Sequence, residues 1–114
     1  MIVELRTYVL HAGQQAAFLG CMEREGLAIE RPILGRLLGY YSSEIGTLNQ
    51  VIHLWGYESF EERARRRLQL AADSAWQRFT PTVMPFIRDM QNQLLTPVPF
   101  APVESLDWAG MGIA

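Results

Sequence analysis

The chain has 114 residues, 49% of them hydrophobic and 19% charged, which suits one globular domain and is too short for two ordinary ones. The net charge of -2 argues against a nucleic-acid-binding surface, and no apolar run approaches the roughly 20 residues that would insert into a membrane. The first residues do not resemble a secretory signal and a single cysteine excludes an intrachain disulfide, so we expect a cytoplasmic protein.

The first two elements differ in the spacing of their apolar residues. Residues 2–10, IVELRTYVL, alternate and are rich in β-branched and aromatic side chains, which predicts a strand. Residues 13–26 repeat apolar side chains at helical spacing, and Gly26 is suited to end a helix in a left-handed turn. We therefore expect a helix that ends at Gly26 and a connection through Pro32.

Two strands are predicted over residues 36–45 and 50–57, joined by GTLN, whose Gly and Asn suit a short hairpin loop. A slip of one residue in their pairing would place Tyr41 opposite His53. With a four-residue loop, the facing pairs are Tyr40 with Trp55, Ser42 with His53, and Glu44 with Val51.

The second helix is predicted over residues 59–72, because Ser59 stands three residues before Glu62 in the arrangement of a capping box. Its four arginines within residues 63–67 follow Glu61 and Glu62 at the spacing of ion pairs, which favours a solvated helix face over an anion site.

Residues 74–80 predict one or two further helical turns, capped by Asp73 and Ser74 and bounded by Pro81 and Pro85. Residues 87–95 predict the last strand. The proline-rich segment beyond it predicts an extended chain in which Phe100 covers apolar surface.

The order strand, helix, strand, strand, helix, strand predicts an α+β ferredoxin-like sandwich, with a four-stranded antiparallel sheet and two helices on one face. The simplest assignment places Val3, Leu5, Ile52, Leu54 and Met90 beneath the helices. The other face is then mixed, and its aromatic rings are too large to leave in water. A second subunit stacked on that face would cover them, so we expect a homodimer or a higher even oligomer. Residues of the mixed face include Glu4, Arg6, Tyr8, Tyr40, Ser42, Glu44, His53 and Trp55.

Three segments, VELRTYVL, LGYYSSEIGTLNQVIHLWGYESFEERARRR and PFIRDMQNQLLTPVPFAP, closely resemble the NIPSNAP family of the dimeric α+β barrel superfamily. The resemblance covers the chain to about residue 103, which we treat as one domain followed by a tail over 104–114. It implies a ferredoxin-like subunit whose sheet pairs with a partner's sheet. It implies no settled activity, since the superfamily includes cofactor-independent monooxygenases, isomerases and haem-handling proteins.

His53 is the candidate catalytic residue, because an imidazole can act as a general base near neutral pH with Ser42 or Glu44 to orient it. The alternative is a buried structural imidazole satisfied by Glu4 or a neighbouring subunit. Candidate ligand-binding residues are Glu4, Arg6, Tyr8, Tyr40, Ser42, Glu44 and Trp55.

The chain contains no motif for a metal, a phosphate or a nucleophilic serine, so we expect no metal and no cofactor. Three functions stay open, led by a homodimer that binds a small planar or apolar molecule in a barrel or helix-sheet pocket. The second is a cofactor-independent oxygenase or isomerase that uses His53. The third is an assembly protein without a ligand. Whether the protein is an enzyme is undecided at this point.

Overall fold

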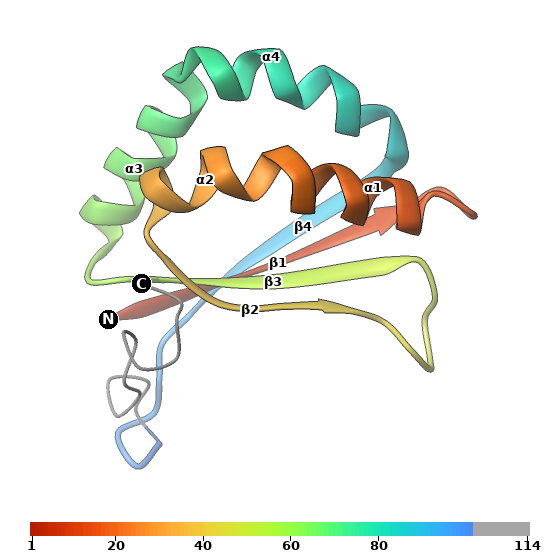
Figure 1. The fold of residues 1–114 in the computed structure, drawn as a ribbon. Coiled ribbons are helices and arrows are strands. Elements are labelled where there is room, and N and C mark those ends of the chain that lie inside the picture. The colour runs from red at the N-terminus through yellow and green to blue at the C-terminus, as the bar shows by residue number, and fades with distance from the viewer. Residues whose placement is uncertain (102–114) are drawn as a thin grey trace.

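The computed structural model describes residues 1–101, which form a four-stranded antiparallel sheet with its helices on one face (Figure 1). The strands lie in the order β2-β3-β1-β4, and the chain order of strands and helical connections is the predicted ferredoxin-like one. The strands are β1 (Ile2–Leu10), β2 (Arg36–Ser42), β3 (Gln50–Tyr57) and β4 (Ile87–Leu95).

The first helical connection is one continuous rod. It consists of α1 (Gln15–Cys21), a π-helical segment η1 (Met22–Gly26) and α2 (Leu27–Leu34). The prediction that it ends at Gly26 is wrong, because Gly26 has ordinary helical angles and the rod ends only at Gly35, whose φ is +94°. Pro32 consequently lies inside α2.

The second connection contains α3 (Phe60–Ala72), α4 (Ser74–Val83) and the short 3-10 helix η2 (Met84–Phe86). Ser59 Oγ accepts a hydrogen bond from the backbone N–H of Glu62 at 3.1 Å, as the capping box predicts. The carboxylate of Glu62 accepts from the backbone N–H of Glu58. Asp73 caps α4 through the backbone N–H of Trp76, as predicted, and α4 continues through Pro81.

The predicted hairpin register is wrong by two residues. Tyr40 lies opposite His53, and Ser42 lies opposite Val51. The reason is a longer loop: β2 ends at Ser42, and residues 43–49 turn with Gly46 and Asn49 at positive φ.

The predicted assignment of the sheet faces is wrong for β1 and β3, although Met90 of β4 lies on the helix side as predicted. His53, Trp55 and Glu4 share a face, as predicted, but that face lies beneath the helices, and their exposed fractions are 1%, 0% and 0%. Leu5 and Leu54 lie opposite each other on the face that no described helix covers. The mixed face is the inner one because the helices bring charged partners to it.

Two apolar clusters join the helices to this inner face. One surrounds Trp55 and Tyr57, and the other surrounds Phe18 and Val51. Within residues 1–101, no helix is both long enough and apolar enough to cross a membrane. Phe100 is 89% exposed in the single chain, so its predicted packing is not seen there. The predicted tail at 104–114 lies outside the described residues.

Candidate functional site

A cavity of about 140 Å³ lies between the sheet and the helices, and we call it the helix-sheet cavity. Strands and helices both line it, because β1, β2 and β3 present alternate side chains toward α2, α3 and α4. Its polar lining residues are Arg6, Tyr8, Glu30, Tyr40, His53, Arg67 and Thr80, and its apolar ones include Phe18, Met22, Trp76, Val83 and Met90.

His53 occupies the sheet side of this cavity as a neutral imidazole. The indole Nε1 of Trp55 donates a hydrogen bond of 2.8 Å to its Nδ1, and an indole N–H only donates, so the proton of His53 is on Nε2. Burial, together with the charges of Arg6 and Arg67, lowers the pKa of His53 to about 3. The ring of Tyr40 stacks on it at 4.7 Å, and Tyr8 meets it edge-on.

Glu4 is the centre of a buried ion-pair network beside the cavity. Its Oε2 accepts from Arg6 at 3.1 Å, from Arg63 at 2.6 Å and from the side-chain amide of Asn92 at 2.9 Å. Burial alone would raise the pKa of Glu4, but the hydrogen bond from Arg63 and the nearby guanidinium charges outweigh it and lower the pKa. Glu4 is therefore ionised and already shared by two arginines.

Glu30 projects from α2 into the same cavity and is only 3% exposed. Burial raises its pKa to about 7, and the charges of Arg67 and Arg6 counteract burial only in part. A carboxyl group in this state takes up or releases a proton near neutral pH, which is what a general acid or a proton-linked binding site requires.

Four buried polar atoms of residues that line the cavity have no hydrogen-bond partner within the described chain. They are Glu30 Oε1, Tyr40 Oη, His53 Nε2 and Arg67 NH1. Buried polar groups in native proteins are nearly always paired with protein groups or ordered water, so these four atoms are available to water or to a bound molecule. Glu4 Oε1, Tyr57 Oη and Arg63 Nε are also unpaired within the described residues, but these residues do not line the cavity.

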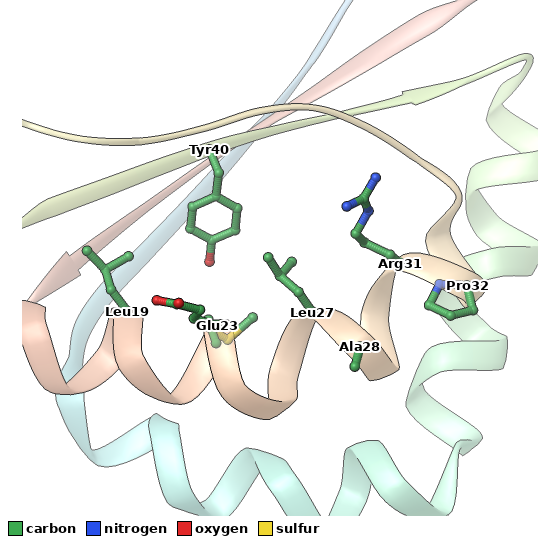
Figure 2. Close-up of a pocket in the computed structure, with 8 residues that line it drawn as sticks. Leu19, Glu23, Leu27, Ala28, Arg31, Pro32 and Tyr40 are labelled. Carbon is green, nitrogen blue, oxygen red and sulfur yellow. The ribbon is translucent and has the colours of Figure 1, made fainter. Parts of the chain in front are cut away.

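A larger, more open groove of about 580 Å³ lies outside the cavity, between the α1-α2 rod and β2. Figure 2 shows Tyr40 reaching from β2 toward the rod, above Glu23 and Leu27. Met22 and Tyr40 line both spaces, so these two side chains form the partition between the groove and the cavity.

The structure brings most of the predicted site residues together and separates two of them. Ser42 is exposed opposite Val51, and Glu44 is exposed in the hairpin loop, so neither orients His53. Trp55 contacts His53 rather than the cavity. The residues placed at or beside the site are Glu4, Arg6, Tyr8, Tyr40, His53 and Trp55.

The sequence patterns did not predict two residues that line the cavity, Arg67 and Glu30. The predicted i,i+4 ion pair forms between Glu62 and Arg66, and Arg65 is exposed. Arg63 and Arg67 do not fit the predicted solvated face, because Arg63 donates to Glu4 and Arg67 lines the cavity. Glu30 was missed because the helix was ended at Gly26. The buried residues of the rod recur every four positions, at Phe18, Met22, Gly26, Glu30 and Leu34, and this stripe is the signal that reveals Glu30.

The sheet order and the single covered face define a ferredoxin-like α+β protein. A putative antibiotic biosynthesis monooxygenase from Nitrosomonas europaea has the same fold, with a TM-score of 0.63 and 10% identity over 86% of this chain and 99% of that one. At this identity the likeness concerns the fold alone.

The NIPSNAP family model matches residues 3–102, and the chain belongs to the NIPSNAP family. A NIPSNAP-like domain protein from Burkholderia xenovorans is 50% identical, with a TM-score of 0.86 over 89% of this chain and 88% of that one. A NIPSNAP family protein from Agrobacterium tumefaciens is 45% identical, with a TM-score of 0.88 over 90% and 97%. Human NipSnap homolog 3A is 32% identical over 89% of this chain, which spans 41% of that protein's length.

Proposed function

We propose that this NIPSNAP protein binds a small planar molecule in the helix-sheet cavity and works as a homodimer. The observation that carries the binding proposal is the set of four unpaired polar atoms on one cavity. An assembly protein without a ligand would be expected to pair such groups internally, because an unpaired buried polar group costs about 1–3 kcal/mol.

The cavity limits the size and shape of the molecule. Its volume of about 140 Å³ is close to that of engineered cavities that accept benzene, which sets the ligand at roughly the size of one substituted ring. The rings of Tyr8 and Tyr40 and the side chain of Met22 offer the apolar contacts that a flat molecule makes on its faces.

The geometry favours a donor role for His53 over the role of general base. A base must accept a proton, but Nδ1 already accepts from Trp55 and Nε2 carries the hydrogen of the neutral ring. His53 would therefore donate Nε2–H to an acceptor atom of the bound molecule.

We place the homodimer interface on the outer face of the sheet, because the helices already cover the mixed face. There Leu5 pairs with Leu54 and Thr7 pairs with Ile52, and all four are only partly exposed in the single chain. Tyr41, on the same face opposite Ile52, is 58% exposed. A second sheet stacked on this face would remove these apolar side chains from water.

Filling the cavity tests the binding proposal. The melting temperature of the full chain is measured with and without millimolar toluene, benzamide or benzoate, for the wild type, Thr80→Phe and Thr82→Phe. Thr80 lines the cavity, whereas Thr82 is an exposed neighbour on the same helix and serves as the matched control. We expect at least one probe to stabilise the wild type and Thr82→Phe but not Thr80→Phe. Stabilisation that survives in Thr80→Phe would contradict the proposal, as would the absence of any effect on the wild type.

A further inference from the structure

Most of the unpaired polar atoms around the cavity are hydrogen-bond donors. Nε2 of His53 carries a hydrogen, and the guanidinium of Arg67 has only donors. The hydroxyl of Tyr40 stays protonated, because burial raises its pKa. Three of the four unpaired atoms are therefore able to donate to a ligand, and what they lack is acceptors.

The charges beside the cavity point in the same direction. Arg6 and Arg63 both donate to Oε2 of Glu4, whereas NH1 of Arg67, a residue that lines the cavity, has no partner among the described residues. Glu30 is the carboxyl group that lines the same cavity as Arg67, and its Oε1 has no partner within residues 1–101. Titratable and charged groups that face Glu30 from the packed elements are Glu4, Arg6 and Tyr8 on β1, Tyr40 on β2, His53 on β3 and Arg67 on α3.

We propose that the cavity takes a small aromatic or otherwise planar carboxylate, held by Arg67, His53 and Tyr40, and that Glu30 has to be protonated for this anion to bind. The statement rests on the proposed function and specifies its ligand. A guanidinium fork matches the planar carboxylate group, and the apolar walls around Phe18 and Trp76 match a ring rather than a fully polar anion such as phosphate.

The coupling to Glu30 follows from charge. An ionised Glu30 would repel the incoming carboxylate and compete with it for Arg67, whereas a protonated Glu30 removes the repulsion and adds an O–H donor. Binding should therefore be accompanied by the uptake of one proton wherever Glu30 is ionised in the free protein. Because its pKa in the free chain is about 7, the affinity should fall roughly tenfold for each pH unit above neutrality.

Calorimetric titration of the full chain with benzoate between pH 6 and pH 9 tests the proposal. Benzamide has the same shape without the charge, and toluene lacks the polar group altogether. Benzoate itself is ionised throughout this range, so a change in its affinity reports on the protein. For the wild type we expect benzoate to bind more tightly than benzamide at pH 6, and its affinity to fall by about fiftyfold from pH 7 to pH 9 with proton uptake.

Three variants identify the residues responsible. Glu30→Gln should bind benzoate with almost the same affinity from pH 6 to pH 9. Arg67→Gln should lose the preference for benzoate over benzamide, whereas Arg65→Gln, an exposed neighbour on the same helix, should behave as the wild type. Circular dichroism melting curves establish that each variant is folded.

The outcomes separate this inference from the proposed function. If benzamide or toluene binds and benzoate does not, the cavity is a binding site but the carboxylate inference is wrong. The coupling is also wrong if benzoate affinity does not change with pH in the wild type, or changes equally in Glu30→Gln. If none of the three probes binds the wild type, both proposals fail.

Discussion

Glu30 is the residue whose ionisation couples the cavity to the stability of the whole chain. Its pKa is about 7 in the folded protein, against an ordinary value of 4.5, so the folded chain holds this proton more tightly than the unfolded chain does. The resulting stabilisation is fully present below pH 4.5 and is lost as the pH rises through 7. At pH 8 the buried carboxylate therefore destabilises the fold.

Glu30→Gln should remove this loss, because glutamine has nearly the same shape and does not titrate. We expect the free energy of unfolding of the variant, relative to wild type, to increase between pH 4.5 and pH 8 by on the order of 3 kcal/mol, since one pKa unit corresponds to about 1.4 kcal/mol. Urea denaturation at a series of pH values measures the difference. The pKa of His53 is about 3, so its contribution to the free energy of unfolding decreases as the pH falls below 6.5. This decrease is the same in both proteins and cancels in the difference between them. Parallel profiles for the two proteins would contradict the assignment of Glu30.

At this scale the sequence led to His53 and its neighbours but not to their chemistry. Side chains alternate between the two faces of a strand, so the spacing of His53 and Trp55 predicted that they share a face. Both are buried as predicted. Their hydrogen bond depends on rotamers and on the covering helices, which no local pattern specifies. Arg67 and Glu30 belong to helices whose charges look solvent-exposed when each helix is considered alone.

At the scale of elements, the α1-α2 rod depends on the close approach of α4 at Gly26. A Cβ at that position would lie 2.6 Å from the sulfur of Met22 and 2.8 Å from Cζ of Phe79. Glycine therefore serves packing here rather than a turn, and a sequence pattern does not distinguish these two roles of a glycine in a helical segment. At the end of the rod it is Gly35 that needs glycine for its backbone angles.

Replacing Gly26 by alanine should consequently destabilise the protein despite the higher helix propensity of alanine. We expect a loss of about 1–3 kcal/mol from overpacking against Phe79. Gly20→Ala is the matched control in the same rod, because the Cβ would meet only the flexible end of Arg24. That variant should be neutral or gain up to about 1 kcal/mol. Thermal melts of the two variants decide the matter, and a Gly26→Ala protein as stable as Gly20→Ala would show that α4 does not pack against the rod as described.

At the scale of the whole molecule, the order of the elements was sufficient to predict the fold, because few topologies accommodate strand, helix, strand, strand, helix, strand. It was not sufficient to orient the sheet. Hydrophobicity identifies the inner face only when the other face is solvated, and here the outer face carries Leu5 and Leu54 while the inner face carries Glu4 and Arg6. When both faces of a sheet carry apolar side chains, hydrophobicity alone does not show which face the helices cover.

The outer face provides the test of the homodimer. Multi-angle light scattering at micromolar concentration should give twice the chain mass for the wild type, and the chain mass for Leu54→Glu, because a carboxylate would be buried between the sheets. Leu48→Glu changes a hairpin residue that is 61% exposed and should leave the dimer intact. A wild-type protein that is a clean monomer in mild salt would rule the dimer out.

Methyl NMR of methionine-labelled protein tests most directly whether a small molecule binds between the sheet and the helices. Met22, Met84 and Met90 line the helix-sheet cavity, whereas Met1 does not. On titration with benzoate at pH 6, we expect the methyl resonances of these three methionines to shift in a saturable manner while that of Met1 stays in place. Resonances that do not move, or that move together with Met1, would contradict the account.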